Sequence, residues 1–142
     1  MGKVQVKYQK NLQHEARIGD KVLILDEPKN VGGDDRGPSP YETMLAALGA
    51  CTSMTMIMYA RRKGWDIQDV EIELSQEKIH AEDCETCETK TGKLDKISRD
   101  IKIKGNINDE QLHRLLEIAE KCPVHRTLTS ENVITDHIEL IP

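Results

Sequence analysis

Two cysteines, Cys51 and Cys122, are the residues of this chain that could do chemistry together. Cys51 lies in a run from residue 43 to 60 that has no charged side chain, and Cys122 directly precedes Pro123. Two thiols that meet can carry out redox chemistry, because a sulfenic acid formed on one condenses with the other to a disulfide. The alternative is a pair of buried, unreactive cysteines, since Cys is among the most buried residue types. Spacing alone leaves both interpretations open.

A reactive thiol needs a neighbour that lowers its pKa, such as a cation or a hydrogen-bond donor. The candidates in this chain are Arg36, Arg17, Arg126 and His125. The sequence alone does not choose among them.

The other two cysteines form a Cys-x-x-Cys motif, Cys84 and Cys87, with His80 four residues earlier. The three side chains are possible zinc ligands, but a closed structural zinc site needs a fourth. Asp83, Glu88 or a second subunit are possible sources. Redox-active pairs usually lie at a helix N-terminus, whereas this motif lies in a polar loop. Metal ligands, a redox or accessory reducing pair, and solvent-exposed loop thiols remain as alternatives.

The charge-free run around Cys51 predicts the core helix of the protein. Ser39 is placed to cap it, Pro40 fits the first helical position, and Glu42 completes a capping box. Three basic residues followed by Gly64 predict its C-terminal end. The run has 18 residues, close to a membrane span, but its Gly, Ser, Thr and Ala content favours a buried helix of a soluble protein.

Period-two alternation, a hairpin partner at residues 14–18 and a short apolar run at residues 22–25 predict strands in the remaining chain, and a second helix is predicted between Asn108 and Pro123. The expected order of elements is β-β-β-α-β-β-α-β, which indicates an α+β fold with mostly antiparallel sheet in a single domain, residues 1–142. The predicted strands cover residues 3–8, 14–18, 22–25, 70–80, 97–104 and 133–141.

Composition limits the partners and the compartment. A net charge of −5, three Tyr and one Trp argue against nucleic acid, which requires basic patches and stacking aromatics. A core without Phe is thin for a monomer and favours a dimer. No signal peptide is visible, so we expect a cytoplasmic protein in which thiols are catalytic or metal-binding more often than disulfide-bonded.

Several segments of the chain resemble the OsmC/Ohr family, the osmotically inducible protein C and organic hydroperoxide resistance proteins. They are residues 26–28, Gly32-Gly33, residues 37–52 and residues 122–128, and the resemblance extends over nearly the whole chain. It implies an intertwined α+β homodimer with two long central helices and active sites at the subunit interface. It also implies a thiol-dependent peroxidase in the oxidative stress response that prefers organic hydroperoxides, with no cofactor or metal.

By this resemblance, Cys51 is the peroxidatic cysteine and Cys122 the resolving cysteine. The Cys51 thiolate would attack the hydroperoxide, an alcohol would leave, and Cys122 would close a disulfide that an external dithiol reduces. An arginine from an upstream loop would stabilise the thiolate, with Arg36 as the first choice and Arg17 as the second.

The sequence departs from the family at the acid that orients this arginine. The family's typical Asn-Pro-Glu motif places a glutamate ten positions before the peroxidatic cysteine. Tyr41 occupies that position here, and Glu42 lies nine before, a rotation of about 100° around a helix. Glu42 therefore does not automatically inherit the role.

Substrate pocket candidates are Tyr41, Met54, Met58 and His125, with the methionines forming an apolar wall.

The competing hypothesis is a protein of the same fold without peroxidase activity. It would bind an acyl or thiol-bearing small molecule in the dimer groove, and Tyr41 would replace the acid because no peroxide is reduced.

Overall fold

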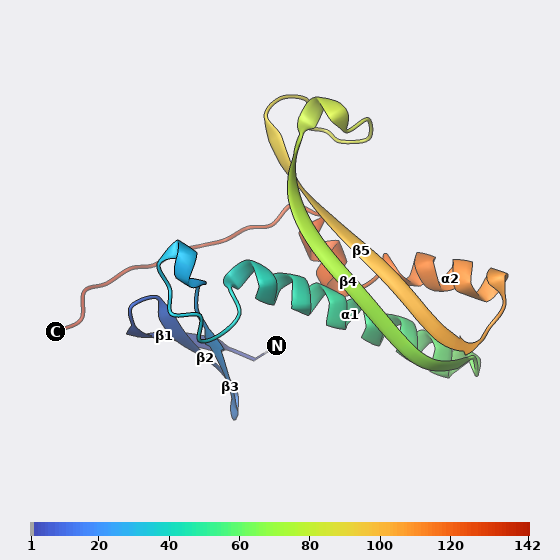
Figure 1. The fold of residues 1–142 in the computed structure, drawn as a ribbon, viewed down its shortest axis with the longest axis horizontal. Helices are drawn as coiled ribbons and strands as arrows, with labels where there is room; N and C mark the ends of the chain where they lie inside the picture. The colour runs from blue at the N-terminus through green and yellow to red at the C-terminus, as the bar shows by residue number, and fades with distance from the viewer. Residues whose placement is uncertain (1) are drawn as a thin grey trace. The chain divides into compact units, whose positions relative to one another are not determined.

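The computed structural model describes residues 2–142 (Figure 1). The chain divides into two compact units, Met1–Ala47 and Leu48–Pro142. Helix α1 (Pro40–Lys63) begins in the first unit and continues into the second.

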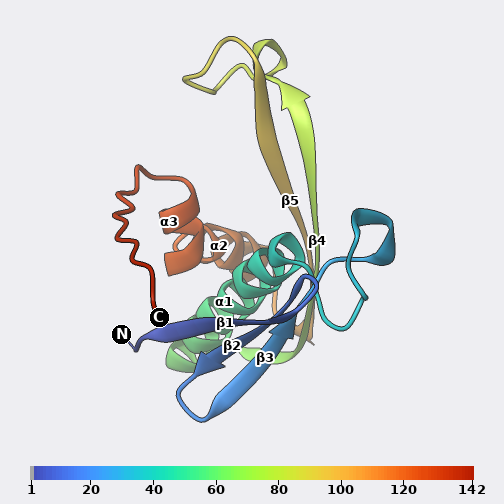
Figure 2. The same cartoon turned by 90° about the vertical axis from the view of Figure 1, so that its left-hand side faces the viewer.

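The first unit contains an antiparallel sheet of three strands, β1 (Val4–Lys10), β2 (Gln13–Ile18) and β3 (Lys21–Leu25), in the order β1-β2-β3 (Figure 2). The two turns contain Asn11 and Gly19, both with positive φ, which these residue types tolerate best. The register pairs Val6 with Ala16 and Ala16 with Leu23. The three N-terminal strands predicted from the sequence are confirmed.

Asp26 organises the loop that joins β3 to α1. Its carboxylate is buried and accepts the backbone N–H groups of Glu27 at 2.8 Å, Arg36 at 3.1 Å and Asp34 at 3.3 Å. Burial acts to raise the pKa of Asp26, but these hydrogen bonds and the charge of Arg36 outweigh it, and the pKa is lowered. These hydrogen bonds hold the loop backbone to the Asp26 side chain before α1 begins.

The start and end of α1 follow the predicted signals. The Ser39 hydroxyl accepts the Glu42 N–H at 3.2 Å, and the Glu42 carboxylate accepts the Ser39 N–H at 3.1 Å. Hydrogen bonds from the backbone and the side chain of Ser39 lower the pKa of the Glu42 carboxyl group. The helix ends at Lys63, and Gly64 follows with a φ of 70°. The predicted capping box and both helix ends are confirmed.

The second unit is built on a long antiparallel hairpin, β4 (Asp66–His80) and β5 (Lys93–Asn106). Helix α2 (Asp109–Ala119) follows, with the predicted capping box between Asn108 and Gln111. The buried core consists of Met56 and Ala60 of α1 and Leu115 and Ala119 of α2. Partly buried side chains of the hairpin pack against it, including Ile72, Ile101 and Ile103.

Helix α1 is long and apolar enough to cross a membrane, by length and composition. A core helix of a soluble protein meets the same criteria, and here Met56 and Ala60 of α1 are buried against α2.

Two predictions at the C-terminal end of the chain are wrong. Helix α2 ends at Ala119, and Cys122 caps a separate short helix, α3 (Pro123–Leu128). The reason is that a residue before proline avoids the helical region, and Cys122 has φ −53° and ψ 130°. The predicted strand 133–141 is not formed, because alternation needs a neighbouring strand to pair with, and residues 131–142 pair with none of residues 2–142.

The spacing of apolar residues in the sequence predicts one packed stripe on α1, made of Met44, Leu48, Cys51, Thr55 and Met58. Leu48 is buried as predicted, but Met44, Cys51 and Thr55 are half-buried and Met58 is exposed. The buried residues of the helix are Leu48, Gly49, Thr52, Met56 and Ala60.

Gly49 of α1 lies close to a side chain of β4. A Cβ added at Gly49 would lie 2.7 Å from Cδ1 of Leu74. We expect Gly49→Ala to be nearly neutral, because Leu74 can shift and Ala gains roughly 0.5–1 kcal/mol of helix propensity. Gly49→Val is expected to lower the free energy of unfolding by about 1–3 kcal/mol through overpacking. Urea denaturation measures both, and a valine variant as stable as the alanine variant would contradict this close packing.

Candidate functional site

The structure brings Cys51 and Cys122 together within the second unit. Cys51 lies on α1, Cys122 lies at the N-cap of α3, and a hydrogen bond joins the two thiols. Cys122 is fully buried and Cys51 is half-buried. A reagent from solvent therefore reaches Cys51 more readily than Cys122.

Several donors converge on the sulfur of Cys122. Burial acts to raise the pKa of this thiol, but the hydrogen bond from Cys51 and those from the backbone of His125 and Val124 and the hydroxyl of Thr52 outweigh it. The pKa of Cys122 is consequently lowered. The His125 N–H lies 3.4 Å from the sulfur.

Cys51 has the higher pKa of the two thiols. Burial raises the pKa of Cys51, and the hydrogen bond that it donates to Cys122 raises it further. Hydrogen bonds with the Val124 N–H and the Thr55 hydroxyl act in the opposite direction without reversing the shift. Of the two thiols, Cys122 therefore loses its proton first as the pH rises.

Arg99 is a site residue that the sequence analysis missed. Its Nη1 donates to Oγ1 of Thr52 at 2.9 Å and to the carbonyl oxygen of Ala119 at 3.3 Å. The signal was present in the alternation of β5, where Ile97, Arg99 and Ile101 share a face and are all half-buried. A charged residue on the inward face of a strand requires a partner, and Thr52 and Ala119 supply it.

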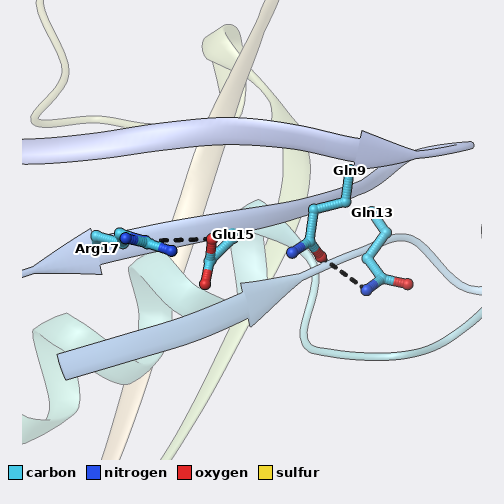
Figure 3. A network of polar contacts seen from close by, with 4 residues as sticks. All are labelled: Gln9, Gln13, Glu15 and Arg17. Atoms are coloured by element: carbon cyan, nitrogen blue, oxygen red, sulfur yellow. Dashed lines mark hydrogen bonds and ion pairs between the residues drawn. The ribbon is translucent and has the colours of Figure 1, made fainter.

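The two arginines favoured from the sequence lie in the first unit. Arg17 of β2 is exposed and pairs with Glu15 at 3.3 Å, beside a hydrogen bond between Gln13 and Gln9 (Figure 3). Arg36 is exposed, and its backbone N–H binds Asp26. A role for either arginine at Cys51 stays a prediction.

The remaining candidates of the first unit and of α1 are mostly solvent-exposed. Tyr41, Met54 and Met58 expose 63%, 62% and 63% of their surface, respectively. Glu42 is engaged in the cap of α1. His125 is half-buried, and its Nδ1 is buried without a hydrogen-bond partner among residues 2–142. Their proposed roles in catalysis or substrate binding stay predictions.

The Cys-x-x-Cys motif forms a disulfide between Cys84 and Cys87, where the sequence had left exposed thiols, redox chemistry and metal binding open. It lies in the loop at the tip of the β4–β5 hairpin, after a short 3-10 helix, Ala81–Asp83 (Figure 1). Within residues 2–142, no group of three or more His, Cys, Asp or Glu side chains is arranged to hold a metal ion.

These features define an α+β protein with a buried, hydrogen-bonded thiol pair between a long helix and a short one. The chain belongs to the family of OsmC-like proteins, whose profile matches residues 32–136. A protein of Haloferax volcanii described as uncharacterized is 24% identical over 118 residues, which cover 82% of this chain and 78% of that protein.

Solved structures confirm the fold. A putative osmotic stress induced and detoxification response protein from Psychrobacter arcticus is 19% identical, with a TM-score of 0.72 over 89% of this chain and 88% of that chain. The organic hydroperoxide resistance protein OhrB of Bacillus subtilis is also 19% identical, with a TM-score of 0.62 over 91% of this chain and 90% of that chain. The OsmC-like α+β fold expected from the sequence motifs is therefore correct.

The direction of the hydrogen bond between the thiols can be tested by titration. In a background with Cys84→Ser and Cys87→Ser, we expect Cys51→Ala to raise the pKa of Cys122, because the thiolate loses a donor. The ultraviolet absorbance of the thiolate against pH measures this, with Met54→Ala on the exposed face of α1 as the matched control. An unchanged or lower pKa of Cys122 in Cys51→Ala would contradict the assignment.

Proposed function

We propose that this protein is a thiol-dependent peroxidase that reduces organic hydroperoxides, with Cys51 and Cys122 as its redox pair. The observation that carries the proposal is that the two thiols lie next to each other, one half-buried and one fully buried, in an OsmC-like fold. Membership of the family supports a redox or stress role. The names of similar structures from Bacillus subtilis and Legionella pneumophila, both organic hydroperoxide resistance proteins, favour this substrate class.

The thiol pair supports a balanced oxidation. The Cys122 thiolate accepts the proton of Cys51 as the Cys51 sulfur attacks the terminal oxygen of the hydroperoxide. The O–O bond breaks, the alkoxide takes a proton from solvent and leaves as alcohol, and Cys51 becomes a sulfenic acid. The Cys122 sulfur then attacks the Cys51 sulfur, and its proton departs with the hydroxyl group as water. The resulting disulfide holds the two oxidising equivalents.

The remaining roles follow the family pattern. We assign stabilisation of the reacting Cys51 to Arg36 or Arg17, and contact with the substrate to Tyr41 and His125, with Met54, Met58 and Glu42 as further neighbours. An external dithiol regenerates the thiols in the cytoplasm. No cofactor, nucleic acid or membrane takes part in the proposed reaction.

We also propose that the protein is a homodimer in which residues 1–142 act as one OsmC-like domain. Five apolar residues near the C-terminus are between 77% and 99% exposed, namely Val133, Ile134, Ile138, Leu140 and Ile141. Clusters of exposed apolar residues mark interaction surfaces. The alternating pattern of residues 133–141 fits a strand that pairs with a second copy of the chain.

Peroxide treatment followed by disulfide mapping tests the proposed reaction. We expect cumene hydroperoxide to form the Cys51–Cys122 disulfide faster than hydrogen peroxide does. Cys51→Ser should not react, and Cys122→Ser should accumulate a sulfenic acid on Cys51 that dimedone traps. The double variant Cys84→Ser/Cys87→Ser serves as the control, with an unchanged rate.

Absence of a Cys51–Cys122 bond with either oxidant would overturn the peroxidase proposal. That result would favour the alternative, an OsmC-fold protein that binds an acyl or thiol-bearing small molecule.

Truncation tests the dimer. Sedimentation velocity of the whole chain is expected to give a dimer, and removal of residues 133–142 should shift it to monomer, because the exposed apolar side chains are lost. Ile134→Ser/Ile138→Ser should weaken the dimer in the same direction, whereas Asp136→Ser/His137→Ser is the matched polar control. A dimer equally stable after truncation would exclude this segment from the interface.

A further inference from the structure

Arg99, Thr52 and Cys122 form a polar chain beside the hydrophobic core of the second unit. The guanidinium of Arg99 donates to the Thr52 hydroxyl at 2.9 Å. That hydroxyl donates to the Leu48 carbonyl oxygen and lies beside the Cys122 sulfur, where it acts to lower the pKa of the thiol. Thr52 and Cys122 are both fully buried. The chain extends from a fixed positive charge on β5 to a sulfur that solvent does not reach.

The Thr52 hydroxyl has one proton and two lone pairs. Arg99 occupies a lone pair, so the proton remains for the carbonyl oxygen of Leu48, 2.7 Å from Oγ1, or for Cys122. A hydrogen bond to a charged acceptor is roughly twice as strong as a neutral one. The hydroxyl therefore favours the sulfur when Cys122 is a thiolate, and the cation behind it strengthens the donor.

Exposure separates the two sulfurs of the pair. In a disulfide between them, the half-buried Cys51 is the sulfur that an incoming thiolate can reach, and the buried Cys122 is the sulfur that would leave. Thiol–disulfide exchange is faster when the departing thiolate is stabilised.

We propose that Arg99, acting through Thr52, is a positioning residue that makes Cys122 the leaving group when the Cys51–Cys122 disulfide is reduced. This inference rests on the proposed function, because it describes the return half of that cycle. It assigns the contact with the external dithiol to Cys51.

The step balances in atoms and electrons. A thiolate of the dithiol attacks the Cys51 sulfur, the Cys51–Cys122 bond breaks, and Cys122 departs with the electron pair as a thiolate. The second thiol of the dithiol then attacks the first dithiol sulfur, which is bonded to Cys51 in the mixed disulfide. Cys51 leaves and takes that thiol's proton. The dithiol is oxidised by two electrons, and the pair regains a protonated Cys51 beside a Cys122 thiolate.

Reduction kinetics test the inference without any peroxide. In the Cys84→Ser/Cys87→Ser background, diamide forms the Cys51–Cys122 disulfide and dithiothreitol then reduces it. Samples are quenched with acid at successive times, and mass spectrometry measures the fraction reduced. We expect Arg99→Met and Thr52→Val to slow reduction by about tenfold, the effect of losing one charge-assisted hydrogen bond. Arg99→Lys should restore part of the rate.

A matched control and a second readout separate positioning from structure. Arg114 is also half-buried, and its guanidinium binds Tyr59 and Glu117, so Arg114→Met should leave the reduction rate unchanged. With a monothiol such as 2-mercaptoethanol, alkylation and peptide mapping should place the mixed disulfide on Cys51. Arg99 also binds Ala119 at the end of α2, so the folding of Arg99→Met is checked by circular dichroism, and Thr52→Val replaces it if it unfolds.

A wild-type reduction rate in Thr52→Val and in folded Arg99→Met, or a mixed disulfide on Cys122, would overturn the inference. Because diamide supplies the disulfide, failure of this inference is distinguishable from failure of the peroxidase proposal. If only the peroxidase proposal fails, cumene hydroperoxide forms no disulfide, but the variants still differ in the rate at which dithiothreitol reduces the diamide-formed disulfide.

Discussion

The packing of α1 against α2 and the β4–β5 hairpin determines where the two thiols lie. Met56 and Leu115 are buried at the centre of this contact, and burial of each such side chain contributes about 1.5–3 kcal/mol. Thr52 lies one helical turn before Met56 on the same face, so the polar chain to Cys122 begins where the apolar core ends. The thiol pair is thus held by the same contact that stabilises the second unit.

Local signals were sufficient to predict most of the fold. Two helix starts were marked by hydrogen bonds within four residues, between Ser39 and Glu42 and between Asn108 and Gln111. Alternation, turn residues and one short apolar run located five strands. The C-terminal strand was mispredicted because a strand depends on a non-local partner. Alternation in residues 133–141 describes what a strand would bury, but the described chain provides no neighbour for it.

The candidate site was predictable only in part for a related reason. Cys51 and Cys122 could be selected by type and motif, whereas the exposure and hydrogen bonds that distinguish them come from tertiary contacts. Arg99 shares a strand face with Ile97 and Ile101, but its partners Thr52 and Ala119 are distant in sequence, so only the tertiary structure shows its contacts. Arg36 is close to the start of α1 in sequence, but its backbone N–H binds Asp26.

The β4–β5 hairpin is long enough to separate the Cys84–Cys87 disulfide from the level of Arg99 and the thiol pair. Arg99 pairs with Leu74, and the last pair of the ladder is His80 with Lys93. Six residues at about 3.3 Å each place the hairpin's end roughly 20 Å beyond the level of Arg99. The Cys84–Cys87 disulfide lies in the loop beyond that end. The distance keeps it from exchanging with Cys51 or Cys122 of the same chain, so each cysteine pair can be oxidised or reduced independently.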